Sequence, residues 1–141
     1  MIEQLAASFV ASAAFGLIFQ APRRALVQCG LIGMLGWSLY VVLTEQEVNA
    51  TIATLIAAGC VGVLCQLMAK LYRMPIIVFS VSGIIPLVPG GLAYDAMRRA
   101  VGNEFDTAIQ LGTKAFLISG AIAMGLVLSE VINQAIRKTK L

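Results

Sequence analysis

The fold of this chain is decided by the stretch Ser80-Val-Ser-Gly-Ile-Ile-Pro-Leu-Val-Pro-Gly-Gly-Leu-Ala-Tyr-Asp-Ala-Met-Arg-Arg99. The first half of this stretch is apolar enough to lie in a lipid bilayer, yet the stretch as a whole contains two prolines, three glycines and an aspartate. Proline lacks a backbone donor and clashes with the preceding helical turn. The stretch therefore predicts a helix that breaks, and the rest of the chain decides where that helix lies.

The composition indicates a membrane protein. The chain has 141 residues, of which 60% are hydrophobic and 12% are charged, whereas soluble domains are about 45–50% apolar and about 25% charged. Long uncharged runs match the roughly 20 residues that a helix needs to cross a bilayer. We therefore expect an all-α bundle of about five transmembrane helices forming one domain over residues 1–141. The expected spans are residues 4–22, 25–44, 48–71, 74–97 and 107–135.

The distribution of basic residues predicts the orientation of these spans. Lysine and arginine occupy the first loop, the third loop and the tail, whereas the second loop holds Glu45 and Glu47. Because basic loops stay in the cytoplasm, we expect the N-terminus outside and the C-terminus in the cytoplasm. The acidic start Met-Ile-Glu-Gln also argues against a cleaved signal peptide, so we expect the first helix to be retained.

Several function classes are disfavoured by the residues that are missing. The chain has no histidine, so the commonest general base is absent, and the two aspartates, Asp95 and Asp106, do not lie in a continuous apolar helix. We expect no catalytic residues, no metal, no cofactor and no enzyme activity. Cys29, Cys60 and Cys65 lack metal-ligand spacing and are interpreted as packing residues. No basic patch is interleaved with aromatic residues, so no nucleic-acid partner is expected.

Small residues recur at helical spacing within the expected spans. Ala58 and Gly62 are four residues apart, as are Ala121 and Gly125. Small residues at this spacing let helix backbones approach closely in lipid. The pattern predicts tight packing, either within the chain or against a partner.

The Pro-x-x-Pro-Gly-Gly motif of residues 86–91 is the strongest functional signal. A broken helix exposes backbone groups, which the bilayer tolerates only where protein buries them or a water-filled cavity meets them. Secondary transporters use such breaks to bind substrates. The plainer alternatives are a proline kink, or a helix that ends at Ile85 before an outer loop.

Polar side chains flank this motif. Ser82 precedes the break, and Asp95 and Arg98 follow it by one and two turns. Asp95 could instead favour a helix dipole or pair with a nearby arginine. The candidate substrate-binding residues are Ser82, Pro86, Pro89, Gly90, Gly91, Asp95 and Arg98.

The run Ile85-Pro-Leu-Val-Pro-Gly-Gly-Leu-Ala-Tyr94, followed by Val101-Gly-Asn103, resembles the threonine/serine exporter family. More narrowly, the chain resembles the short membrane subunit that corresponds to the C-terminal half of full-length exporters. This resemblance implies export of small amino acids, or of dicarboxylates such as succinate in two-component members. It also implies a second membrane subunit that resembles the N-terminal half.

We therefore expect a subunit of a secondary exporter in the bacterial cytoplasmic (inner) membrane, in contact with lipid and with a small-molecule substrate. Two alternatives remain open, namely a small homo-oligomeric channel or transporter and a membrane scaffold that transports nothing. Asp95 and Glu130 are carboxylates that could carry protons, and the sequence does not choose between them.

Overall fold

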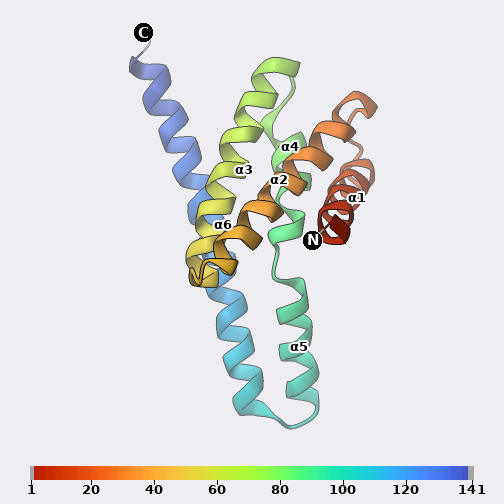
Figure 1. Cartoon of the computed structure of the whole chain (residues 1–141), viewed down its shortest axis with the longest axis vertical. Coiled ribbons are helices and arrows are strands. Elements are labelled where there is room, and N and C mark those ends of the chain that lie inside the picture. The colour runs from red at the N-terminus through yellow and green to blue at the C-terminus, as the bar shows by residue number, and fades with distance from the viewer. Residues whose placement is uncertain (1, 140–141) are drawn as a thin grey trace.

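The computed structural model describes residues 2–139, and this part of the chain is helical throughout, with short turns and no strand. Figure 1 shows a bundle from which one helical hairpin projects. The α-helices are α1 (Ile2–Ile18), α2 (Leu26–Glu45), α3 (Ala50–Tyr72), α4 (Ile76–Gly83), α5 (Gly90–Val101) and α6 (Phe105–Thr139). Two 3-10 helices, η1 (Arg23–Ala25) and η2 (Ile85–Leu87), precede α2 and follow α4. The prediction of an all-α membrane bundle is confirmed.

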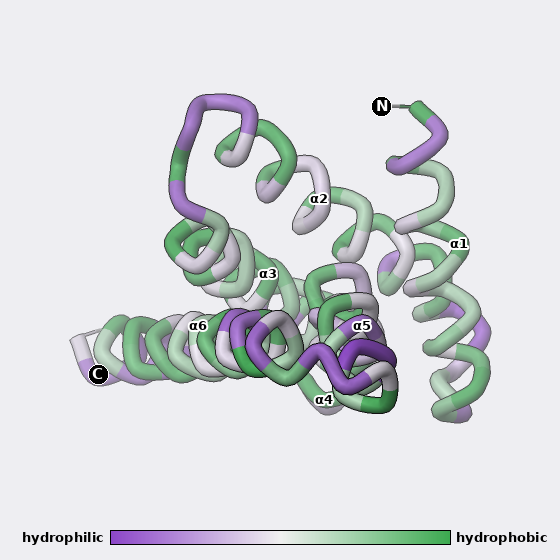
Figure 2. Tube along the Cα trace, turned by 90° about the horizontal axis from the view of Figure 1, so that it is seen from below, coloured by the Kyte–Doolittle hydropathy of each residue, from purple (hydrophilic) through white to green (hydrophobic). Residues whose placement is uncertain are grey.

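The core lies where α2, α3 and α4 meet. Its largest fully buried side chains include Ile32 on α2, Val61 on α3 and Phe79 on α4. Cys29 and Cys65 are buried in it, as expected of packing residues, whereas Cys60 is exposed. Many large hydrophobic side chains are exposed on the helices, and hydrophilic residues gather in the α2–α3 and α5–α6 turns (Figure 2). An apolar exterior with polar turns suits a bundle surrounded by lipid.

Small residues hold α3 and α6 close together. A Cβ atom added to Gly125 of α6 would lie 2.7 Å from the Leu55 carbonyl oxygen and 2.8 Å from the Ala58 Cβ of α3. Gly62 packs in the same way against the Ser129 side chain. The predicted tight packing of small residues therefore occurs within the chain.

The helices that could cross the membrane differ in length from the five spans that the sequence predicts. Within residues 2–139, three helices are long and apolar enough to cross a membrane, residues 23–45, 50–72 and 105–139, and the bent pair formed by residues 76–87 and 90–101 could be a fourth. Helix α1 is shorter, at 17 residues, and ends at Ile18, four residues before the end of the expected span 4–22. Helix α6 extends beyond both ends of the expected span 107–135. Its 35 residues make a rod about 52 Å long. The count of five spans stays a prediction.

The fourth expected span is broken where the prolines predict. Helix α4 ends at Gly83, the short η2 contains Pro86, and α5 begins at Gly90 with its axis turned by 52°. The chain continues in the same general direction after the break, away from the α3–α4 turn (Figure 1). The span is therefore bent, and its second half continues into the projecting hairpin of α5 and the start of α6.

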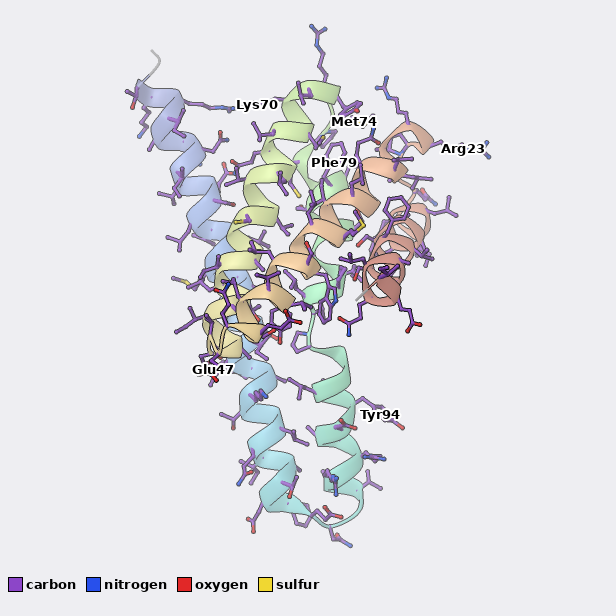
Figure 3. The ribbon with its side chains drawn as sticks, viewed as in Figure 1. Arg23, Glu47, Lys70, Met74, Phe79 and Tyr94 are labelled. Carbon is purple, nitrogen blue, oxygen red and sulfur yellow. The ribbon has the colours of Figure 1, made fainter. Side chains whose placement is uncertain are left out.

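The charged turns lie at opposite ends of the bundle. Figure 3 places Arg23 and Lys70 at one end and Glu47 at the other, with Tyr94 further along on the projecting hairpin. Helix α3 follows an Asn49 cap that accepts a hydrogen bond from the Thr51 amide at 2.9 Å, and it ends at Tyr72, just before Arg73, whose left-handed backbone (φ 53°) stops the helix. We call the end that carries Arg23 and Lys70 the basic end.

Candidate functional site

A cavity of about 220 Å³ lies beside the break in the fourth span. Helices α2, α3, α5 and α6 all contribute to its lining, as does the broken segment itself. Its lining includes Trp37, Tyr40, Thr54, Pro86, Pro89, Gly91, Leu92 and Ile118. We call it the break cavity. Three of the predicted site residues, Pro86, Pro89 and Gly91, therefore share one cavity.

The side chains opposite the prolines give the break cavity an aromatic and polar wall. Trp37 and Tyr40 lie almost one turn apart on α2, with ring centroids 5.2 Å apart. Trp37 donates from Nε1 to the Gln4 side-chain oxygen at 3.3 Å, and buried Thr54 donates from Oγ1 to the Ala50 carbonyl at 2.7 Å. This wall presents both apolar ring faces and hydroxyl oxygens, so it suits a small ligand that is partly polar.

A second cavity of about 250 Å³ shares Trp37 and Pro86 with the break cavity. Its other lining residues include Gln4, Ser8 and Ala11 of α1. Together the two cavities extend from α1, past the shared tryptophan and proline, to the start of α5.

Ser12 of α1 carries a buried hydroxyl at the contact between α1 and α2. Ser12 Oγ is buried and has no hydrogen-bond partner among the described residues, and Ser12 packs directly on Gly33 of α2. A Cβ atom at Gly33 would also come within 3.4 Å of Pro86 Cγ. Only a glycine at this position lets α1 and the broken segment approach α2 together.

The backbone at the break leaves amide groups free of the usual helical ladder. The Gly90 amide donates to the Val88 carbonyl at 2.8 Å, and the Ala93 amide donates to the Pro89 carbonyl at 3.1 Å. The first amides of a helix have no partner within that helix, and the helix dipole favours negative charge there. The start of α5 can therefore offer Gly91 and Leu92 donors beside the break cavity. A Cβ atom added at Gly90 or Gly91 would meet nothing within 4 Å, so there is open space on that side of the start of α5.

The other predicted site residues lie away from the break cavity. Ser82 is buried within the fourth span, where its Oγ donates to the Val78 carbonyl at 2.9 Å. Asp95 pairs with Arg98 at 3.6 Å on the surface of α5, and both side chains are about half exposed. Neither of these charged residues lines the break cavity. Their role in substrate binding stays a prediction.

The sequence reasoning missed the wall made by Trp37, Tyr40 and Thr54. The available signal was the single tryptophan of the chain, with a tyrosine three residues later inside an uncharged run. It also missed a polar pocket between α3 and α6 at the basic end, which contains Gln66 and Glu130. Within residues 2–139, no group of three or more histidine, cysteine, aspartate or glutamate side chains is placed to hold a metal ion.

These features define a multi-pass α-helical membrane protein with a broken helix beside a cavity. A family model described as "Threonine/Serine exporter, ThrE" matches residues 4–132, and the chain belongs to the threonine/serine exporter family. The chain is therefore an exporter-type membrane transport protein, from a family of transporters and not from a class of enzymes. No solved structure matches the chain.

Proposed function

We propose that this protein is a subunit of a secondary exporter of threonine, serine or similarly small amino acids. The observation that carries the proposal is the break cavity, which joins Pro86, Pro89 and Gly91 to the Trp37–Tyr40 wall. Broken helices of secondary transporters use free backbone groups and helix ends to hold substrates. A cavity of about 220 Å³ is smaller than the roughly 300–1,000 Å³ of sites for drug-sized ligands. It therefore suits a small metabolite.

Each end of a small amino acid has a fitting group at this site. The amides at the start of α5 suit a carboxylate, since a helix N-terminus favours negative charge. The hydroxyls of Tyr40 and Thr54 suit the polar side chain of threonine or serine. The Trp37 and Tyr40 rings can lie against a substrate ammonium. No covalent chemistry is required, so we propose no enzyme activity.

A partner would complete the pathway. The break cavity lies in a chain of few spans, and large apolar side chains face outward along α6, for example Phe116 at 77% exposure. We propose that a second membrane subunit, resembling the N-terminal half of full-length exporters, covers part of this surface. We place the assembly in the bacterial inner membrane, with the basic end in the cytoplasm.

Metabolite accumulation tests this proposal. Cells lacking the protein should retain more threonine or serine when fed dipeptides that contain them, and expression together with the partner should restore export. Retention of succinate alone would assign the exporter to C4-dicarboxylates instead. Export by this chain alone as one stable oligomer would favour the homo-oligomeric transporter, and unchanged levels of all three metabolites would contradict an exporter.

A further inference from the structure

A pocket distinct from the break cavity lies between α3 and α6 at the basic end. Its volume is about 410 Å³. Its polar lining consists of Gln66, Lys70, Arg73, Glu130, Asn133 and Arg137. Figure 3 shows Lys70 near the end of α3 opposite Glu47, so this pocket and the break cavity lie toward different ends of the bundle. We call it the basic-end pocket.

The basic-end pocket gathers charges of both signs. Lys70 and Arg73 come from α3 and the turn after it, whereas Glu130 and Arg137 come from α6. Three cationic side chains thus share the lining with one carboxylate. A uniformly basic lining would favour any anion. A carboxylate among the cations instead disfavours an anion that carries no positive charge, since like charges repel.

Hydrogen bonds hold the single carboxylate in place. Glu130 accepts at Oε2 from the Gln66 side-chain amide at 3.1 Å and at Oε1 from Gln134 at 3.3 Å. Gln66 is itself only 7% exposed, so it fixes Glu130 from the buried side of the pocket. Each carboxylate oxygen can accept a further hydrogen bond. Glu130 can therefore receive a ligand ammonium without giving up its present partners.

The cations are positioned from both helices. Lys70 donates from Nζ to the Asn133 side-chain oxygen at 3.2 Å, which links α3 to α6 across the pocket. Arg73 is held by the left-handed turn that ends α3, with its amide bonded to the Ala69 carbonyl. Arg137 lies on α6 two turns beyond Glu130 and lines the same pocket. Guanidinium groups match the two oxygens of a carboxylate or phosphate.

We propose that the basic-end pocket binds a primary ammonium and an oxyanion carried by the same small molecule. Glu130 receives the ammonium, and Arg73, Arg137 and Lys70 receive the oxyanion. Two sources carry this chemistry, a free amino acid and the headgroup of phosphatidylethanolamine. For a free amino acid, the inference deepens the proposed export function, because the pocket then captures substrate at the end where export begins.

Equilibrium binding to the purified full-length chain in detergent tests the proposal, because it needs neither the partner nor transport. The probes are radiolabelled L-serine, L-threonine and a short-chain phosphatidylethanolamine. The competitors are propylamine and propionate, each carrying only one of the two charges. We expect at least one probe to bind, and each single-charge competitor to displace it only at much higher concentration.

The variants Glu130→Gln and Arg137→Gln should each weaken binding by about tenfold or more, the scale of one hydrogen bond to a charged group. Lys114→Gln is the matched control, because Lys114 is an exposed cation on the same helix outside the pocket. Arg137 is also exposed, so this variant should fold even if Glu130→Gln does not.

Binding of serine or threonine assigns the pocket to the free amino acid, and binding of the lipid alone assigns it to the headgroup. Binding of no probe, or equal affinity in both variants and the control, contradicts the proposal. Export from cells separates this failure from that of the proposed function. If Glu130→Gln and Arg137→Gln export threonine normally, the pocket is unnecessary while the exporter proposal stands.

Discussion

Gln66 of α3 donates a hydrogen bond to Glu130 of α6 at 3.1 Å, and this contact joins residues 64 positions apart in the sequence. The donor is buried and its partner carries the only carboxylate among the residues that line the basic-end pocket. The same pair therefore contributes both to the packing of α3 on α6 and to the chemistry of that pocket.

Replacement of Gln66 by Leu should lower the free energy of unfolding by about 1–3 kcal/mol, since it leaves one Glu130 oxygen without its buried donor. Thermal unfolding of the purified protein in detergent measures this change. Gln134→Leu is the matched control, because Gln134 donates to the other Glu130 oxygen at 3.3 Å from an exposed position. Equal stability of the two variants would mean that the hydrogen bond from buried Gln66 contributes no more to the free energy of unfolding than the one from exposed Gln134.

Gly125→Ala should destabilise the α3–α6 contact by about 1–3 kcal/mol, the usual range for overpacking. The reason is the position of the added Cβ, 2.7 Å from the Leu55 carbonyl oxygen. Gly120→Ala on the same helix is the control, because a Cβ there meets nothing within 4 Å, and it should stabilise the helix by up to about 1 kcal/mol. Comparable melting temperatures for both variants would show that α3 and α6 are not closely packed at Gly125.

Asp95→Asn should leave threonine export close to the wild-type rate. Its pair with Arg98 is long, at 3.6 Å, and exposed, and exposed pairs contribute only about 0–1 kcal/mol. The assay is export from cells at matched protein abundance. Glu104→Gln, which removes a second surface pair with Arg99, is the control. A loss of threonine export in Asp95→Asn alone would restore Asp95 to the substrate site.

The orientation in the membrane is tested by reporter fusions. The basic end carries Arg23 and Lys70, and Glu47 lies at the opposite end (Figure 3), so the rule for basic residues puts the basic end in the cytoplasm. A reporter active only in the cytoplasm should work after residue 141 and fail when inserted in the loop of residues 44–49. Activity at both positions would overturn this orientation.

Local signals in the sequence predicted the helices and the break. Apolar runs and the chemistry of Pro86 and Pro89 act over a few residues, so they are visible without a structure. The end of α1 at Ile18 and the full length of α6 were not predicted. The expected span 107–135 already ran through Lys114 and Glu130, and α6 continues a few residues further at both ends, from Phe105 to Thr139, because the polar residues there do not stop a helix.

Of the break-cavity residues named above, the sequence predicted only those that are neighbours along the chain. Pro86, Pro89 and Gly91 are neighbours in sequence and share the break cavity, whereas Trp37 and Thr54 reach it through the packing of separate helices. Asp95 follows the motif closely in the sequence but does not line the break cavity, because the chain turns by 52° at the break and Asp95 pairs with Arg98 on the surface of α5. Its role in substrate binding stays a prediction.

The central claim is that the break in the fourth span forms the transport site. Its most direct test is the double variant Pro86→Ala, Pro89→Ala, which removes the obstacles to a continuous helix between α4 and α5. Pro22→Ala is the control, because Pro22 is exposed in the turn before α2 and lines neither described cavity at the break.

The measurement is the rate of labelled threonine export from cells that express each variant with the partner, normalised to the amount of protein in the membrane. We predict that the double variant reaches normal abundance but loses most of its export, while Pro22→Ala exports like the wild type. Normal export by the double variant at normal abundance would contradict the claim and leave the break as a structural bend.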